Sequence, residues 1–151
     1  MAKRTRAKAE ATATTGTDPV LALADYWLSA EYMRLQTHAV RSKWARARSR
    51  YWHEFRTYHS YWLSALYVVV EGFETLGLDT TKVPEMTSKH IGRLKTFRNA
   101  SFHFQKKTKK QMQFFEPGDF EALDWAERLH AQLHAFFRAY LGLPLNPSQR
   151  S

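Results

Sequence analysis

Apolar residues recur every three or four positions over most of this chain, and that spacing allows little besides α-helix. The first such stripe comprises Leu23, Trp27, Ala30, Met33, Thr37, Val40 and Trp44. Because an α-helix turns once every 3.6 residues, these positions share one face. No segment shows the strict alternation of apolar and polar residues that marks a half-buried strand. The pattern therefore predicts an all-α fold, a bundle of four main helices.

Helix-capping residues, prolines and glycines predict where the helices begin and end. Asp18-Pro19 fits an N-cap followed by proline at the first helical position, and the first helix should break within KWARARSR, residues 43–50. A second helix is expected at about 51–76, buried on nearly every side around 61–73 and widened there by Tyr61, with Gly77 as its C-cap. A loop at 77–86, a third helix from 87 or 88 to about 104 and a last helix from 117 or 119 to 140 follow.

The two ends of the chain differ from this helical middle. Residues 1–17 have almost nothing to bury and predict a disordered basic tail, residues 18–145 one helical domain, and 146–151 a short flexible C-terminus. No apolar run follows the basic start, and the most apolar stretch, WLSALYVVV at 62–70, is too short to span a bilayer. We therefore expect a cytoplasmic protein with no membrane partner.

Composition narrows the classes of site and assembly. The chain has no cysteine, which excludes a disulfide scaffold, a thiolate zinc site and a cysteine nucleophile. Its aromatic content of 15% is high for a helical protein, and large aromatic surfaces are often shared with a partner subunit. We therefore expect an oligomer.

The charge of the chain is strongly polarised. The net charge is +9, and every charged residue between 86 and 115 is Lys or Arg, whereas residues 116–141 are mostly acidic where charged. One face should be cationic, and RNA or another phosphate polymer is the commonest partner of such a face, although it could simply keep the protein in solution. The side chains expected to bind RNA are Lys95, Lys106, Lys107, Lys109, Lys110, Arg41, Lys43, Arg46, Arg48 and Arg50.

Five of these cations lie in RSKWARARSRYW, residues 41–52, interleaved with aromatic residues. Arginine beside aromatic rings suits single-stranded RNA, which it can hold by phosphate contact and base stacking. A solvated helix end whose tryptophans point inward explains the same residues equally well. Arg56 and His59, further along the second helix, could extend the basic face.

One short stretch, FRNASFHF at 97–104, suggests chemistry. Asn99 and His103 lie four residues apart on one helix face, whereas Arg98 and His103 are about 140° apart. Arg98 and His103 converge only if the helix is irregular, if the arginine reaches round, or if a second copy approaches. A histidine can transfer a proton near neutral pH, an arginine can grip phosphate oxygens, and an amide can orient either. RNA supplies its own nucleophile, the 2′-hydroxyl, so these groups suit RNA cleavage; a capping Asn, a partly buried His and a surface Arg are the structural alternative.

This stretch resembles the signature of the HEPN domain family, in which an Arg is followed by a polar residue and, four to six residues after the Arg, by a His. The resemblance implies an all-helical homodimer and a metal-independent endoribonuclease that needs no cofactor and leaves a 2′,3′-cyclic phosphate. It further implies a toxin or a phage-defence component, with an antitoxin or other regulatory protein as a partner. Carried over to this chain, it makes His103 the general acid–base, Arg98 the phosphate clamp and Asn99 the orienting residue. The runner-up is a catalytically inactive HEPN-type module that binds RNA or protein, and a DNA-binding helical protein is a weaker third hypothesis.

Two further groups invite a functional interpretation. Glu71 interrupts the most apolar part of the second helix and could orient Arg98 or His103, or it could face water at the helix end. His130 and His134 have the i, i+4 spacing of zinc ligands, and Glu127 lies on the same side. No further ligand cluster is evident, so we predict a polar helix face and no metal site there.

Overall fold

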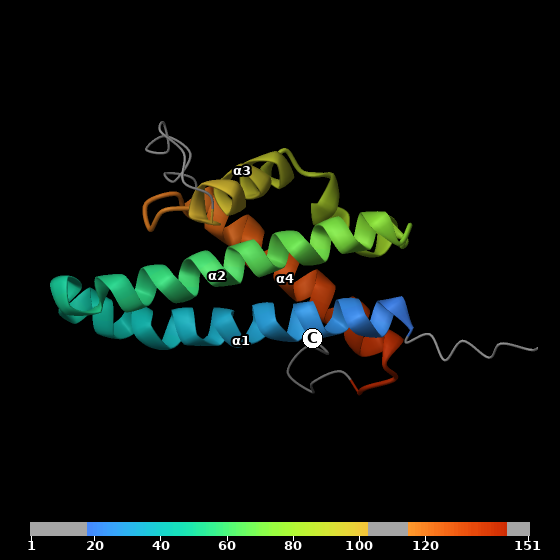
Figure 1. Ribbon diagram of the computed structural model, residues 1–151, viewed down its shortest axis with the longest axis horizontal. Coiled ribbons are helices and arrows are strands. Elements are labelled where there is room, and N and C mark those ends of the chain that lie inside the picture. The colour runs from blue at the N-terminus through green and yellow to red at the C-terminus, as the bar shows by residue number, and fades with distance from the viewer. Residues whose placement is uncertain (1–17, 103–114, 145–151) are drawn as a thin grey trace, which may run out of the picture.

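The computed structural model describes residues 18–102 and 115–144, and within these ranges all regular structure is helical (Figure 1). It comprises α1 (Pro19–Arg46), α2 (Arg48–Thr75), α3 (His90–Phe102) and α4 (Phe120–Tyr140), with two short 3₁₀ turns at Thr80–Lys82 and Pro84–Thr87. This confirms the predicted all-α class and the four main helices. None of the described helices is both long and apolar enough to cross a bilayer. The predicted tail at 1–17 and the C-terminal residues 146–151 lie outside the described ranges.

The first two helices form a long antiparallel hairpin. The Asp18 carboxylate caps α1 by accepting a hydrogen bond from the Val20 N–H at 2.9 Å, as the Asp-Pro pair predicts. Ala47 alone separates the helices, inside the segment where a break was expected, and α2 begins three residues earlier than the pattern suggested. Along α1 the predicted stripe is buried through Leu23, Trp27 and Val40.

Helix α2 lies at the centre of the domain. In Figure 1 it runs between α1 on one side and α3 on the other, while α4 crosses behind the hairpin. Leu63, Leu66 and Phe73 are each 0% exposed, so the central position predicted for α2 is confirmed. Tyr61 departs from the prediction, because it is 49% exposed, with its ring in a T-shaped contact with Phe102 from α3.

The segment expected to be a loop at 77–86 is more ordered than its sequence indicates. It contains the two 3₁₀ turns, and Val83 and Met86 are buried against the core. The Trp125 indole N–H donates to the Glu85 carbonyl oxygen at 3.3 Å, which fastens the second turn to α4. Gly77 has a φ of 62°, the left-handed conformation expected of a C-cap glycine.

Two glycines in helices give opposite predictions for stability. A Cβ added at Gly72 would overlap the Leu23 side chain, because α1 and α2 approach closely there, whereas a Cβ at Gly92 in α3 meets nothing within 4 Å. We expect Gly72→Ala to lower the free energy of unfolding by about 1–2 kcal/mol through crowding of the buried leucine. Gly92→Ala should raise it by about 0.5–1 kcal/mol, because alanine favours helix more than glycine does. Urea unfolding of both variants measures these two changes. If Gly72→Ala and Gly92→Ala changed the free energy of unfolding equally and in the same direction, the close packing of α1 on α2 at Gly72 would be contradicted.

Candidate functional site

The last turn of α3 carries two of the three motif residues. Arg98 and Asn99 are both half-buried, and an Arg98 Nη1–H donates a hydrogen bond to Asn99 Oδ1 at 3.0 Å. Arg98 also lies over the ring of Tyr67 from α2, with 6.0 Å between the guanidinium carbon and the ring centroid. The amide and the aromatic face therefore hold the guanidinium from two sides.

No ion pair neutralises Arg98 among residues 18–102 and 115–144. A half-buried arginine usually gains a carboxylate partner, because its charge is costly to remove from water. Here an amide oxygen and a ring face take that place, and neither cancels the positive charge. Arg98 can therefore still accept an anion such as a phosphate.

His103 follows directly after the described part of α3 and lies outside the described residues, as do Lys106, Lys107, Lys109 and Lys110. The angle between Arg98 and His103 therefore remains a prediction. Lys95, one turn before Asn99 on α3, is exposed and adds a cation near the motif.

Two aromatic side chains stand at the surface beside the motif. Phe102, the residue before His103, is 46% exposed and meets the half-exposed Tyr61 of α2 edge to face, with their ring centroids 5.0 Å apart. Exposed aromatic rings can stack on nucleobases or pack against a second copy of the chain. The sequence pattern assigned Tyr61 to the core and so missed this pair.

Glu71 is not brought to Arg98. Its side chain is exposed, and it lies with Pro19, Tyr26 and Gly72 along a shallow hollow between α1 and α2. The structure shows no ion pair between Glu71 and Arg98, so the orienting contact to the arginine is not formed. A contact to His103 would fall outside the described residues.

The cations predicted around the α1–α2 turn are placed unevenly. Lys43, Arg46 and Arg50 are exposed, and the Arg50 guanidinium lies 5.5 Å from the Tyr51 ring centroid. The side chain of Arg48 lies outside the described set. Arg41 is exposed as well, and it also lines a cavity between α1, α2 and α4. Part of the predicted basic surface therefore coincides with a pocket.

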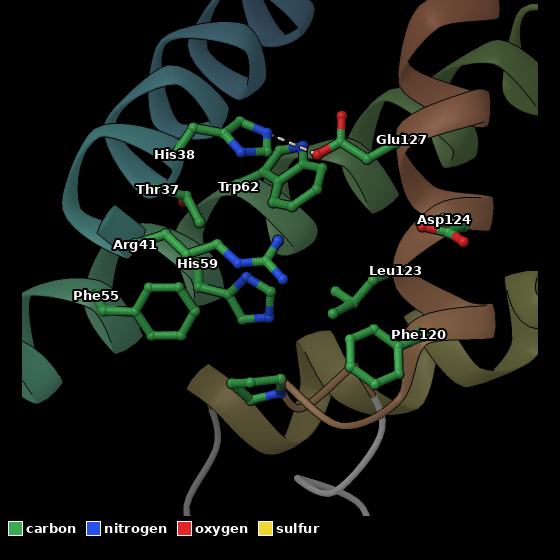
Figure 2. Close-up of a pocket in the computed structure, with 11 residues that line it drawn as sticks. Thr37, His38, Arg41, Phe55, His59, Trp62, Phe120, Leu123, Asp124 and Glu127 are labelled. Carbon is green, nitrogen blue, oxygen red and sulfur yellow. Dashed lines mark hydrogen bonds and ion pairs between the residues drawn. The ribbon is translucent and has the colours of Figure 1, made fainter. Parts of the chain in front are cut away.

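His59 does not extend the basic face as its position suggested. It is 6% exposed, and its Nε2–H donates to the Phe115 carbonyl oxygen at 2.7 Å. Burial lowers the pKa of His59 to about 4. The hydrogen bond to Phe115 raises this pKa, whereas the nearby positive charge of Arg41 lowers it further. His59 is therefore neutral at physiological pH and lines the same cavity as Arg41 (Figure 2).

A charged network that the sequence pattern did not reveal joins α1 to α4. His130 Nε2 contacts Glu31 at 2.6 Å, Arg34 donates to both Glu31 oxygens, and Arg34 also reaches Glu127 at 3.1 Å. His38 Nε2 completes the network with Glu127 at 2.7 Å. The α1 and α4 partners are about 90–100 residues apart in sequence, so helical spacing could show Glu127 and His130 on one face but not which residues they contact.

This network predicts a pH-dependent contribution to stability. The pKa of Glu31 is lowered from 4.5 to about 2. The hydrogen bond from His130 is the main cause, and it outweighs burial, which raises the pKa. Since the pKa of Glu31 is lower in the folded than in the unfolded state, its ionised carboxylate stabilises the fold. This contribution is complete above about pH 5 and is lost as the pH falls toward 2. Hydrogen bonds to charged groups contribute about 1.5–3 kcal/mol, and partial solvent exposure reduces this, so Glu31→Gln should cost about 1–2 kcal/mol at pH 7.

Urea unfolding at pH 7, 5 and 3 measures this effect. The difference between wild type and Glu31→Gln should shrink below pH 5, while the exposed Glu74→Gln should leave stability unchanged throughout. A pH-independent difference would show that the charge of Glu31 does not stabilise the fold.

His130 and His134 are not arranged as metal ligands. His130 Nε2 is occupied by Glu31, and His134 packs edge-on against Trp27 with ring centroids 5.2 Å apart. Within residues 18–102 and 115–144, no group of three or more His, Asp or Glu side chains could hold a metal ion.

Comparisons of the chain with protein-family models, with curated proteins and with solved structures found no match. The resemblance to HEPN domains therefore depends on residues 97–104 and on the all-helical architecture.

Proposed function

We propose that this protein is a metal-independent endoribonuclease of the HEPN type. The observation that carries the proposal is Arg98, a half-buried cation that an amide and a ring hold in place without an ion-pair partner among the described residues. An arginine held in this way suits a phosphate that gains charge during a reaction. It lies at the end of the helix that leads into His103.

The proposed reaction is a transesterification within the RNA. The 2′-oxygen attacks the adjacent phosphorus and loses its proton to a base, a new P–O2′ bond forms, and the P–O5′ bond breaks. The leaving 5′-oxygen gains a proton, so the products are a 2′,3′-cyclic phosphate and a 5′-hydroxyl. His103 would transfer protons, Arg98 would stabilise the charge on the phosphoryl oxygens, and Asn99 would keep the guanidinium in position.

The proposal includes a homodimer. Arg98 and His103 of one chain are expected about 140° apart around the helix, so a second copy could bring its own Arg98 or His103 to complete the site. Tyr61 and Phe102 form an exposed aromatic pair where two α3 ends would meet. A second apolar stripe lies on α1, but α3 lies on the far side of α2 in Figure 1, so contact through α1 would not bring two motifs together. That stripe consists of Leu21, Leu28, Tyr32 and Leu35.

The biological setting we propose is a cytoplasmic toxin or phage-defence component, controlled by an antitoxin or another regulatory protein. The alternative is an inactive RNA-binding module. It is favoured by the exposed Tyr61–Phe102 pair, which can stack on bases without any cleavage.

Substrates that differ at one sugar test the proposed reaction. The RNA strand should be cut, and the same strand should resist at any position where deoxyribose replaces ribose, because the nucleophile is then missing. Cleavage that continues at a deoxyribose would rule out attack by the 2′-hydroxyl. Binding of both strands without any cleavage would favour the inactive module.

A further inference from the structure

A row of large apolar side chains runs along the outer face of α1. Leucines recur there every seven residues, at Leu21, Leu28 and Leu35, and they are 42%, 52% and 50% exposed. Tyr32, between the last two, is 58% exposed. At about 100° per residue, this row lies about 140° round α1 from its buried face, and the described helices leave it open. A contiguous apolar row, unlike scattered single residues, marks an interaction surface.

The spacing of this row is that of a coiled-coil seam, which predicts a helix as its partner. With the leucines at heptad position d, position a is filled by Asp25, Tyr32 and Ala39, and Ser42 takes the next d. The seam therefore spans three heptads, about 32 Å from Leu21 to Ser42. Asp25 is its only charged side chain, and it decides how a partner can be oriented.

The charges along α1 make the helix complementary to itself in the reverse direction. Asp25 is exposed near the N-terminal end of α1, whereas Lys43 and Arg46 are exposed at its C-terminal end. None of the three has an ion-pair partner among residues 18–102 and 115–144. Asp25 and Lys43 are eighteen residues apart, about five full turns, so they lie on the same flank of the seam. A two-fold axis that pairs two α1 helices antiparallel brings equal flanks together, so each Asp25 meets the Lys43 of the second copy.

Asp25 also disfavours the other ways of pairing two α1 helices. Parallel helices face position a against position a, which would place two Asp25 carboxylates side by side. An antiparallel pair shifted by seven residues would place Asp25 against Leu35, where an unpaired buried charge is costly. The register with Asp25 opposite Ser42 leaves the carboxylate beside Lys43.

We propose that α1 binds the α1 helix of a second copy in this antiparallel register. The inner layers then pair Leu28 with Ala39 and Tyr32 with Leu35. Residues 1–17 are no competing occupant, because their only apolar side chains are alanines and one methionine. The α1 and α3 helices lie on opposite sides of α2 in Figure 1, so this contact leaves the motif accessible and goes beyond the dimer proposed at α3. With both contacts, the chains would form assemblies larger than a dimer.

The association should depend on protein concentration. The seam is short and includes Asp25, Ala39 and Ser42, so we expect a dissociation constant on the order of 10 µM. Leu28→Ala should therefore have little effect on unfolding at about 1 µM protein, where α1 is uncovered, and a larger one at about 100 µM.

Engineered cysteines test the register, because the chain has none of its own. Leu28→Cys and Ala39→Cys are mixed at about 100 µM, oxidised and resolved by mass. The proposed register puts the two cysteines in one layer, so the mixed disulfide should form in preference to either symmetric one, whose sulfurs would belong to layers about 16 Å apart.

The control replaces Leu28→Cys by Glu74→Cys, an exposed position on α2. A mixed disulfide no faster than in this control would show that α1 makes no contact. Symmetric disulfides of Leu28→Cys alone would indicate parallel helices. Either result overturns the proposal.

Charge reversal in the same cysteine pair tests the contact between Asp25 and Lys43. Asp25→Lys or Lys43→Asp alone should slow formation of the mixed disulfide about tenfold, and the two together should restore most of the rate. Glu74→Lys makes the same change of charge as Asp25→Lys away from the seam and should have little effect. Failure of the double reversal to recover the rate would contradict the antiparallel ion pair.

Cleavage assays on the same samples separate this inference from the proposed function. RNA cleavage without the mixed disulfide leaves the ribonuclease standing and overturns the α1 pairing. The mixed disulfide without RNA cleavage supports the pairing and contradicts the ribonuclease.

Discussion

Replacing Arg98 by alanine is expected to lower the rate of RNA cleavage by about a hundredfold to a thousandfold, the usual cost of removing one group that stabilises charge in a transition state. The guanidinium is half-buried and bonded only to Asn99 and the Tyr67 ring among the described contacts. Its removal should therefore leave the fold intact. Circular dichroism and urea unfolding of the variant check this before its rate is measured.

Two variants show whether the effect belongs to the geometry of Arg98 or to its charge. Lys95→Ala removes an exposed cation from the same helix and should cost only a few-fold, mainly through weaker RNA binding. Arg98→Lys keeps the charge but loses the two-pronged grip on phosphate, and it should recover only part of the rate. If Lys95→Ala were as damaging as Arg98→Ala, the motif would have no special role.

Replacing Phe73 by alanine should cost about 3–5 kcal/mol of the free energy of unfolding. Phe73 is 0% exposed near the C-terminal end of α2 and meets Phe136 of α4 edge to face, with centroids 4.8 Å apart. Truncation removes apolar contacts on both helices and leaves a cavity that the surrounding helices can fill only in part. Since small domains unfold with about 5–15 kcal/mol, this loss would be a large part of the total.

Leu28→Ala is the matched control for the core. Leu28 is 52% exposed on α1, and its truncation should change the free energy of unfolding by less than about 0.5 kcal/mol. Both values come from urea unfolding at one pH. A small effect at Phe73 would contradict the central position of α2, and a large effect at Leu28 would indicate that a second copy covers α1.

Sequence periodicity predicted the fold well because it reports which face of each helix is apolar. It found the α1 stripe, the break near Ala47 and the buried centre of α2. It could not predict how α4 crosses the hairpin, because that depends on which stripes meet and at what angle. Tyr61 shows this limit, since it follows the apolar spacing but is 49% exposed, with Phe102 of α3 beside it.

The candidate sites were less predictable because they depend on long-range partners. The motif placed Arg98 and Asn99 at one helix end, and the structure adds Tyr67 as the ring beneath the arginine. No local signal could show that His59 lies against Phe115, 56 residues later. A histidine within an aromatic run was the available clue, and it fits a buried ring as well as a surface one.

The most direct test of the central claim is incubation of the purified protein with a labelled mixed-sequence RNA in excess EDTA, beside His103→Ala. We predict that the wild-type protein cuts the RNA and leaves 2′,3′-cyclic phosphate ends, while His103→Ala binds the RNA and leaves it intact. Failure of the wild-type protein to cut any RNA across a range of pH would contradict the ribonuclease, as would undiminished cleavage by His103→Ala.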